Sequence, residues 1–531
     1  MGDSATRRQA GKFSIRWDES RAAQAYADGW WVRETLADAL DRAADRDPTR
    51  VLIVDGAMRV DAATLQRQAR QMASALALRM APGGVVSFML PNWHEAAVVY
   101  LGATLAGMVA NPILPSLRDH DLRFILGDAA TRIIFIPGTF RGHDYPAMLA
   151  RVAAEMADPP EVVVVRGPGG TPFADLLDGS APKAAFSPLD PDSVRMILYT
   201  SGTTGRPKGV LHTHNSLHAL LRQIGAHWHV APGDRFLVPS PVSHIGGSIY
   251  AFEAPLLLGT RAVLMDRWDP AVAVPLMDAE AITHMAGATP FLRGLLDAAR
   301  AAGTRLDTLK VFICGGASVP PALIEEARGT FARALVSRVY GSTEVPVTTV
   351  GALQPGDDVL AAQTDGRPGI AEVRLGPDDE ICARGPQMLA GYLHPEDEEG
   401  AFDADGFYRS GDQGRWVDDC LVVSGRIKDL IIRNGENIAP KEIEDLLLAH
   451  PAVAEIAIVG LPDARTGERA CAVVVPRDGH TVDVAGLAAL LAEQGVARFK
   501  VPEQVELRAA LPRNEAGKVL KHVLRAELSA A

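Results

Sequence analysis

Short runs of β-branched and other apolar residues recur along this chain, and helix-periodic segments separate them. The predicted strands lie at residues 132–136, 161–165, 195–199, 262–265, 310–313 and 335–339. Between two of them, residues 216–228 carry apolar side chains at the spacing of an α-helix. After the run at 310–313, a glycine turn leads to Pro320 and Pro321, which are suited to open a helix. Strand, turn and helix in this order predict an α/β fold with layered, mostly parallel sheets and ligands at the strand ends.

The length of the chain predicts more than one domain, since a domain usually holds roughly 100–200 residues and this chain has 531. Near Ser424 the pattern changes to a compact module with its own predicted helix at 440–450 and strand at 454–459. We therefore expect a large domain at residues 1–426 and a small α+β domain at residues 427–531. Within the large domain, residues 166–188 are rich in Gly, Pro, Ala and Ser, and we expect a surface linker there.

Charge and cysteine content exclude several classes of function. The formal net charge of -12 argues against a nucleic-acid partner or an anionic membrane surface. The four cysteines have no C-x-x-C spacing, so neither a disulfide framework nor a zinc site is predicted, and a reducing cytoplasm fits. The most apolar stretch, at residues 98–110, ends at Asn111 and Pro112 and is too short to span a bilayer. We expect a cytoplasmic protein without a membrane span.

The stretch YTSGTTGRPKGV at residues 199–210 concentrates glycines and hydroxyl side chains behind an apolar run. Hydroxyl groups offer O–H donors, glycines let backbone N–H groups approach a ligand, and Lys208 and Arg206 add positive charge. The stretch departs from the Walker pattern, because Pro207 stands where the second glycine belongs and Gly209 where Ser or Thr would hold magnesium. It predicts a phosphate-binding loop of another kind. An ordinary turn between a strand and a helix is the alternative.

Further polar clusters follow downstream, at residues 340–344, 408–412, 424–437 and 511–518. The first offers an aromatic face, hydroxyls and one carboxylate, and the second places Asp412 at a glycine turn. Each cluster alone also has a structural explanation. Tyr340 fits a core position, Glu344 a solvated cap, Asp412 an Asx turn, and Lys518 an ordinary surface lysine. No single cluster defines a reaction.

Together and in this order, these motifs resemble the AMP-forming adenylating superfamily of acyl- and aryl-CoA ligases, nonribosomal-peptide adenylation domains and beetle luciferases. The resemblance runs from about Asp38 to Leu524. The stretches at residues 17–20 and 28–31 are most similar to the branch that holds medium-chain and cyclohexanecarboxylate CoA ligases. The resemblance implies a large N-terminal domain with the ATP and acyl sites. It also implies a small, mobile C-terminal domain that carries the catalytic lysine and the CoA tunnel.

The resemblance also implies two half-reactions with ATP and CoA as co-substrates and Mg²⁺ as cofactor. First, the substrate carboxylate attacks the α-phosphorus of ATP and gives acyl-AMP and pyrophosphate. Then the C-terminal domain rotates, and the thiol of CoA displaces AMP. Because charge redistributes over the phosphates in the first step, its catalysis is chiefly a matter of electrostatics and positioning.

The matched positions assign roles toward the nucleotide. The β- and γ-phosphates are expected to be gripped by Thr200, Ser201, Gly202, Thr203, Thr204 and Lys208. Thr343 is expected to contact the α-phosphate, and Glu344 to help hold Mg²⁺, a hard cation that prefers oxygen ligands. Tyr340 is expected to stack on adenine, in a pocket lined by Gly315, Gly316, Ala317 and Gly341. Asp412 is expected to accept hydrogen bonds from both ribose hydroxyls, and Arg426 to lie near the ribose and phosphate.

The remaining matched positions concern the acid, the thiol and the domain rotation. Lys518 is expected to bridge the substrate carboxylate and the α-phosphate during adenylation only. Lys428 is expected to be the pivot of the rotation. Gly435 is expected to lie where the pantetheine arm passes, because a side chain there would obstruct it. His244 is expected to border the acyl pocket.

One departure from other branches bears on the substrate. Amino-acid-activating relatives have an aspartate where this chain has Ile245, and residues 241–252 contain no acidic residue. A buried ammonium without a counter-charge is costly, which argues against an amino acid substrate.

Three functions fit these observations. The first is an acid–CoA ligase for an apolar acid of the medium-chain, alicyclic or aromatic type. The second is an adenylating enzyme that passes acyl-AMP to a carrier protein, and the third is an inactive binding or scaffold homologue. The expected partners are a small-molecule carboxylic acid, ATP and CoA, with a homodimer left open.

Overall fold

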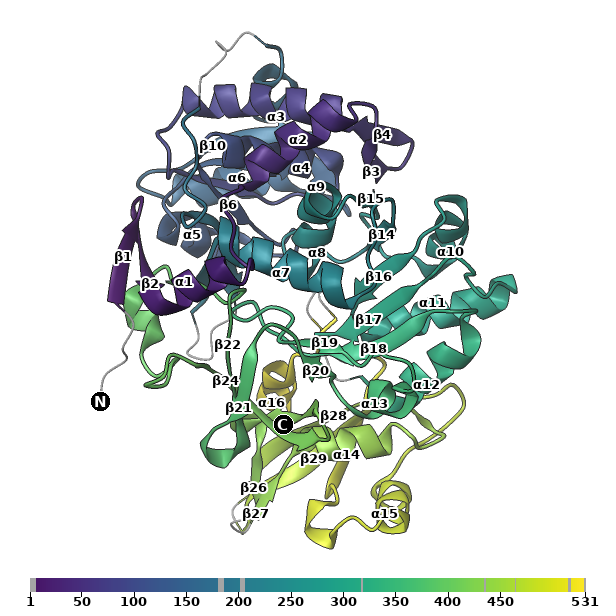
Figure 1. Cartoon of the computed structure of the whole chain (residues 1–531). Coiled ribbons are helices and arrows are strands. Elements are labelled where there is room, and N and C mark those ends of the chain that lie inside the picture. The colour runs from purple at the N-terminus through teal and green to yellow at the C-terminus, as the bar shows by residue number, and fades with distance from the viewer. Residues whose placement is uncertain are drawn as a thin grey trace.

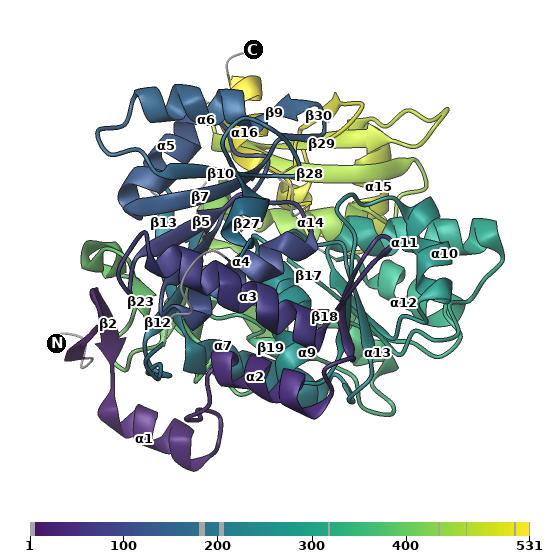
Figure 2. The same ribbon diagram turned by 90° about the horizontal axis from the view of Figure 1, so that it is seen from above.

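The structure is a computed structural model that describes residues 6–179, 186–200, 206–316, 319–433, 436–463, 465–513 and 517–529. Most of the chain forms two large sheets with helices around them, and a smaller module lies at the C-terminal end (Figure 1). Figure 2 shows the N-terminal hairpin and first helix at one side of this body and helices α10, α11 and α12 (Pro270–Ala279, Thr289–Ala302 and Pro321–Thr330) at the other.

The first large sheet is parallel over most of its width and antiparallel at one edge. In order across the sheet its strands are β11 (Thr171–Pro172), β10 (Glu161–Val165), β7 (Thr131–Pro137), β5 (Val85–Phe88), β6 (Val109–Pro112), β12 (Val194–Thr200), β13 (Lys208–Thr213) and β23 (Gly391–Tyr392). Pairing is parallel from β11 to β12 and antiparallel from β12 through β13 to β23. The antiparallel edge brings β23, from far along the chain, beside the strand that begins at Lys208.

The second large sheet is parallel apart from its last pair. Its strands are, in order, β18 (Leu335–Val339), β17 (Val311–Gly315), β16 (His284–Gly287), β14 (Arg235–Val238), β15 (Arg261–Leu264), β3 (Val51–Asp55) and β4 (Met58–Asp61). Only the hairpin of β3 and β4 is antiparallel among these described strands. The carboxyl ends of the parallel strands therefore meet along one edge, as the sequence predicts.

Helices pack around both sheets and bury two large hydrophobic cores. They are α2 (Leu36–Arg46), α3 (Ala62–Ala77), α4 (His94–Leu105), α5 (Asp119–Asp128), α6 (Tyr145–Ala154), α7 (His214–His227), α8 (Ile245–Ser248), the π-helical η2 (Ile249–Glu253), α9 (Ala254–Leu257), α10, α11, α12 and α13 (Asp358–Gln363). Helix α4 is buried from Glu95 to Leu105, which explains the apolar stretch noted in the sequence. Within the described residues, every helix is too short or too polar to cross a membrane.

Smaller elements complete the large body. An antiparallel sheet holds β21 (Glu372–Leu375), β22 (Glu380–Arg384), β24 (Tyr408–Val417) and β25 (Cys420–Arg426). The short pairs are β1 (Thr6–Ala10) with β2 (Phe13–Trp17), β8 (Thr139–Phe140) with β9 (His143–Asp144), and β19 (Thr349–Gly351) with β20 (Arg367–Pro368). The remaining helical turns are α1 (Glu19–Ala27), η1 (Phe173–Leu176), η3 (Pro377–Asp379) and η4 (Pro395–Glu398).

The C-terminal module has its own sheet and its own core. The chain leaves β25 at Arg426, makes the turn η5 (Ile427–Asp429) and enters a new sheet. That sheet contains β27 (Glu436–Ile438), β26 (Ile431–Arg433), β29 (Gly467–Pro476), β28 (Val453–Asp463) and β30 (Gln504–Leu507), with helices α14 (Pro440–Leu447), α15 (Val484–Glu493) and α16 (Lys521–Ser529) and the turn η6 (Arg498–Lys500). The predicted boundary at residue 426 lies at this change of sheet and stays a prediction.

The predicted fold class is confirmed, and one local expectation is wrong in part. The strands predicted at 161–165 and 335–339 coincide with β10 and β18. The linker expected at 166–188 is not irregular throughout, because β11 within it pairs with β10 and η1 follows directly. Thr171 and Pro172 extend the sheet by a short edge strand, where proline costs little because an edge strand has unpaired backbone positions in any case.

Candidate functional site

The predicted nucleotide residues gather where three sheets meet. Gly315 ends β17 and pairs with Val339, the last residue of β18, so the glycine turn and Tyr340 follow neighbouring parallel strands at the same edge. A Cβ on Gly315 would lie 2.8 Å from the backbone oxygen of Val339, so a larger residue does not fit. Gly316 has a φ of +81° and open space beside it, which suits a wall that a ligand approaches closely. Ala317 lies outside the described residues.

Tyr340, Asp412 and Arg426 form one hydrogen-bonded cluster. The hydroxyl of Tyr340 donates to Oδ2 of Asp412 at 2.7 Å, and Nε of Arg426 donates to Oδ1 at 3.0 Å. Burial, together with the charge of Asp412, raises the pKa of Tyr340 well above its ordinary value, so the hydroxyl stays protonated. Each carboxylate oxygen accepts more than one hydrogen bond, and Asp412 can therefore still accept from two neighbouring hydroxyls. This arrangement is suited to hold a ribose beside an aromatic face.

The loop after Tyr340 is held by contacts to two strands of the first sheet. The Nε2 of His212 donates to the backbone oxygen of Thr343 at 2.8 Å. Burial lowers the pKa of His212 to about 4, so the ring is neutral at neutral pH and one nitrogen is free to donate. The hydroxyl of Tyr392 donates to Oε1 of Glu344 at 3.1 Å. A Cβ on Gly341 would lie 2.6 Å from the nitrogen of Val347, so the loop folds back tightly on itself.

The carboxylate of Glu344 fits a hard cation. Its side chain is buried, and its partner is a tyrosine hydroxyl. No described Lys or Arg lies within 4.0 Å of it, so its charge is not neutralised by an ion pair there. Oxygen ligands of this kind are what Mg²⁺ prefers. Glu344 is therefore suited to contribute a ligand to such an ion.

The described residues of the phosphate loop are Thr200, the last residue of β12, Arg206, and Lys208, the first residue of β13. Thr200 pairs with Lys208 across the two strands. The Nζ of Lys208 donates to the backbone oxygen of Asp397 at 3.1 Å and lies 5.3 Å from the ring centre of Tyr392. Arg206 donates to the carboxylate of the same Asp397 at 2.7 Å. The predicted Ser201, Gly202, Thr203 and Thr204 lie outside the described residues.

Lys518 comes from the C-terminal module and lies beside the nucleotide cluster. Burial lowers its pKa, the charge of Arg426 lowers it further, and the charges of Asp412 and Asp429 oppose this. The preceding Gly517 has a φ of +81° and approaches the ring of Pro290, which lies in α11 of the large body. The module is therefore oriented with its lysine toward the site. Gly435 lies outside the described residues, and Lys428 is exposed in η5.

His244 lies apart from these polar groups, at the residue before α8. Its Nε2 is buried and has no hydrogen-bond partner among the described residues. Burial lowers the pKa of the ring, so it is neutral at neutral pH. A Cβ on Gly246 would meet nothing within 4 Å, whereas one on Gly247 would lie 2.0 Å from the oxygen of Pro241. In the loop after Tyr340, Val347 also has an unusual backbone conformation, with a φ of +47° that a β-branched residue rarely adopts.

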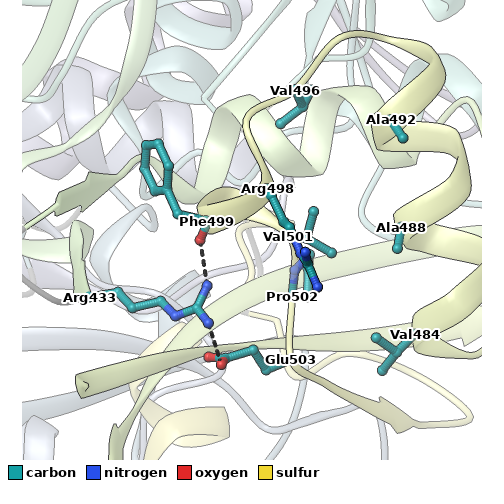
Figure 3. Close-up of a pocket in the computed structure, with 10 residues that line it drawn as sticks. All are labelled: Arg433, Val484, Ala488, Ala492, Val496, Arg498, Phe499, Val501, Pro502 and Glu503. Atoms are coloured by element: carbon teal, nitrogen blue, oxygen red, sulfur yellow. Dashed lines mark hydrogen bonds and ion pairs between the residues drawn. The ribbon is translucent and has the colours of Figure 1, made fainter. Parts of the chain in front are cut away.

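A separate pocket lies wholly within the C-terminal module. It has a volume of about 840 Å³ and is bordered by α15 and the segment around η6 (Figure 3). Arg433 closes one side by donating to the backbone oxygen of Phe499 at 2.8 Å and to Glu503 at 2.5 Å. Its lining residues do not include any of the predicted nucleotide or acyl residues.

Sequence reasoning missed three residues that contact the predicted set. They are His212, Tyr392 and Asp397. His212 stands in an apolar strand, where a buried histidine is common, and the other two lie roughly 190 residues beyond Lys208. The tyrosine in Gly391-Tyr392 was the one feature of the sequence that could have pointed to this segment. Only the pairing of β23 with β13 brings Tyr392 and Asp397 to the loop.

Comparisons with known proteins identify the family of the chain. The family model described as AMP-binding enzyme matches residues 40–393, and the model described as AMP-binding enzyme C-terminal domain matches residues 442–518. The medium-chain fatty-acid–CoA ligase of Escherichia coli strain K12 is 31% identical over 541 residues, which cover 97% of this chain and 94% of that protein. A second relative, from Rhodococcus jostii strain RHA1, is 34% identical over 514 residues, which cover 93% of this chain and 98% of that protein. It is named 3-[(3aS,4S,7aS)-7a-methyl-1,5-dioxo-octahydro-1H-inden-4-yl]propanoyl:CoA ligase. The crystal structure of ATP-bound MatB from Rhodopseudomonas palustris matches with a TM-score of 0.82 at 29% identity, and the match covers 93% of this chain and 99% of that one.

Proposed function

This chain belongs to the AMP-binding enzyme family and is an AMP-forming acid–CoA ligase, and we propose that its acid is uncharged and largely hydrocarbon. ATP and CoA are its co-substrates. The adenylation chemistry is supported by Lys518 of the C-terminal module, because burial lowers its pKa and the charges of Arg426 and Asp412 act on it in opposite directions. A lysine there suits a negative charge that develops between a carboxylate and the α-phosphate.

In the first half-reaction, we assign the residues as the motifs imply. Lys208, Thr200 and the loop hold the β- and γ-phosphates. Asp412 accepts from the ribose hydroxyls, Tyr340 stacks on adenine with Gly315, Gly316, Ala317 and Gly341 around it, and Arg426 lies near the ribose and phosphate. Thr343 contacts the α-phosphate, and Glu344 holds Mg²⁺, which neutralises phosphate charge. The observed cluster of Tyr340, Asp412 and Arg426 supports these assignments by placing the aromatic ring and the acceptor together.

In the second half-reaction, we propose that residues 427–531 move as one domain against residues 1–426. Lys428 is the pivot, because it lies exposed in the turn between two sheets that share no strand. Lys518 leaves the site, and the pantetheine arm of CoA passes Gly435 to reach acyl-AMP. The thiolate then attacks the acyl carbon, and AMP is the leaving group.

The acyl side supports an apolar acid of medium size. Residues 241–252 contain no carboxylate that would pair with a substrate ammonium, and Gly246 leaves open space. His244 borders this region with a neutral ring. The E. coli relative is named a medium-chain fatty-acid–CoA ligase and the Rhodococcus relative acts on a fused-ring propanoyl acid, so both are consistent with this size. We propose a medium-chain, alicyclic or aromatic acid.

The test is CoA-dependent release of AMP with a panel of acids under saturating ATP. The panel holds acetate, octanoate, cyclohexanecarboxylate, benzoate, palmitate and phenylalanine. Because each buried methylene contributes about 0.8 kcal/mol, acetate should lose to six- to ten-carbon acids by several kcal/mol in kcat/KM. Acetate or phenylalanine as the best substrate would contradict the apolar pocket, and palmitate would contradict its size.

The same assay separates the alternatives. An enzyme that passes acyl-AMP to a carrier protein would form acyl-AMP without responding to CoA, and an inactive homologue would release no AMP. We also propose a cytoplasmic location, with which four buried, unpaired cysteines are consistent. A homodimer stays a prediction that light scattering would test.

A further inference from the structure

Residues 391–398, which span β23 and η4, run along the strand that begins at Lys208. Strand β23 pairs antiparallel with β13, and the nitrogen of Leu393 donates to the oxygen of Gly209 at 2.7 Å. The segment is therefore fixed in register beside the phosphate loop. The assignments above give a role to none of its side chains.

Asp397 is the residue of this segment that contacts both cations of the loop. Its Oδ1 accepts from Nη2 of Arg206 at 2.7 Å, and its backbone oxygen accepts from Nζ of Lys208 at 3.1 Å. The same Nζ lies 3.8 Å from Oδ1. The side chain of Asp397 is only 7% exposed, whereas that of Arg206 is 40% exposed. A buried carboxylate thus faces the two positive charges that polyphosphate would contact.

The second oxygen of this carboxylate strengthens the observation. Oδ2 of Asp397 is buried and has no hydrogen-bond partner among the described residues. A buried carboxylate oxygen without a hydrogen-bond partner is costly. A neutral side chain would serve equally well for packing or for a single hydrogen bond, without that cost. The feature that Asp397 supplies to its neighbours is therefore its negative charge.

That charge opposes the binding of phosphates. Two cations attract polyphosphate, and a carboxylate a few ångströms from both lowers the potential that the ligand meets. The contacts to Asp397 do not block a ligand, because an ammonium has three donors and a guanidinium five. Lys208 and Arg206 keep donors for phosphate oxygens while Asp397 reduces the strength of their attraction.

We propose that Asp397 is a counter-charge of the phosphate loop, which competes with polyphosphate for Arg206 and Lys208 and weakens the binding of both ATP and pyrophosphate. This inference rests on the proposed function. Its consequence lies after adenylation, when pyrophosphate leaves the loop. Without the counter-charge, two cations would retain the product. Asp397 is thus an affinity-setting residue that acts through Arg206 and Lys208.

Glu398 is a matched control at the next position. It is buried to a similar degree, and it also pairs with two arginines, at 2.7 Å to Arg7 and 3.1 Å to Arg16. Those arginines belong to the N-terminal strands β1 and β2. Neutralising Glu398 therefore makes the same change of charge, and its arginine partners lie in the N-terminal strands and not in the phosphate loop.

The experiment measures binding of Mg²⁺–pyrophosphate and Mg²⁺–ATP to the full-length protein by calorimetry. Asp397→Asn keeps an oxygen for Arg206 and the backbone oxygen for Lys208, and it removes only the charge. We expect both ligands to bind about three- to tenfold more tightly, and pyrophosphate to inhibit turnover at correspondingly lower concentration. Glu398→Gln should stay within about twofold of the wild type, since the charge of Glu398 is paired with Arg7 and Arg16 and not with the cations of the loop. A gain of affinity is not what structural damage produces.

Unchanged or weaker binding by a folded Asp397→Asn protein would overturn the proposal, as would equal tightening by Glu398→Gln. Adding Arg206→Gln to Asp397→Asn should cancel most of the gain if the carboxylate acts through Arg206. If Asp397→Asn does not fold, Asp397→Ser carries the same test, because a hydroxyl accepts from Arg206 without charge. A wild-type protein that binds no ATP would instead contradict the proposed function, so the two failures are distinguishable.

Discussion

On the nucleotide side of the site, both oxygens of Asp412 accept hydrogen bonds, one from Tyr340 and one from Arg426. On the acyl side, Nε2 of His244 is buried with no partner among the described residues, and Gly246 faces open space. In the proposed site, the first region would recognise its ligand through fixed polar groups, and the second through volume and apolar contact. Changes on the nucleotide side should therefore affect every acid alike, and changes on the acyl side should alter the ranking of acids.

The largest effect should come from Lys518→Ala, which should abolish adenylation with every acid. A charge contact made in the transition state contributes roughly 3–4 kcal/mol, or about 10²–10³ in rate. Thioester formation from synthetic acyl-AMP and CoA should be largely spared, because Lys518 acts in one orientation of the module. Following both half-reactions separately tests this, and an equal loss in both would make Lys518 a structural residue.

Lys428→Pro should produce the opposite pattern. Proline fixes φ near −65° and removes a backbone donor, so the pivot would lose its second set of dihedral angles. Lys428 is exposed, so the folded state should tolerate the change. Pyrophosphate release in a single turnover should survive, while thioester formation falls at least about tenfold. A variant that forms thioester at the wild-type rate would place the pivot elsewhere.

Asp412→Asn should raise KM for ATP by about 10–100-fold, since a hydrogen bond to a charged group contributes roughly 1.5–3 kcal/mol. The increase should be the same with octanoate and with benzoate. Steady-state kinetics at varied ATP with each acid provide the measurement. An increase that depends on the acid would show that the two sides of the site are coupled, and the comparison above would then fail.

Gly246→Val should change the ranking of acids and leave KM for ATP unchanged. The added side chain has room, because a Cβ there meets nothing within 4 Å. It occupies volume that about three methylenes would otherwise fill, so cyclohexanecarboxylate should lose about tenfold or more relative to a shorter acid. Gly247→Ala is the control, since its Cβ would lie 2.0 Å from a backbone oxygen and should lower the melting temperature instead. Unchanged selectivity in a folded Gly246→Val protein would remove this region from the acyl site.

The smallest effect concerns pH. Burial and the neighbouring Arg426 lower the pKa of Lys518, and the charged form is the one that adenylation needs. The charged fraction therefore falls as pH rises through a pKa below the ordinary lysine value, and adenylation should decline on the alkaline side earlier than a free lysine would predict. Lys518→Arg, at reduced rate, should shift that decline upward because a guanidinium stays charged. Gly246→Val should leave it in place.

Local patterns in the sequence were sufficient for the fold class and for the motif residues. The runs at 161–165 and 335–339 are strands because β-branched residues suit a sheet buried on both faces. Such a preference depends on residues adjacent in the chain, so the sequence alone shows it. Element ends were less accurate. The helix predicted to reach residue 450 ends at Leu447, where no local residue forces the stop. Part of the expected linker at 166–188 joined a sheet edge, because pairing with β10 outweighed its weak local preference.

By itself, the sequence determined the chemical type and the order of the candidate residues, since a glycine turn, a carboxylate and a lysine can be read directly along the chain. Only the tertiary structure decided which side chains meet. Tyr392 reaches Glu344, and Asp397 reaches Arg206, because β23 pairs with β13 from far along the chain. Lys518 comes under the charges of Arg426 and Asp412 through the orientation of a separate module. Contacts of this range depend on strand order and packing between sheets, which no local spacing of residues encodes.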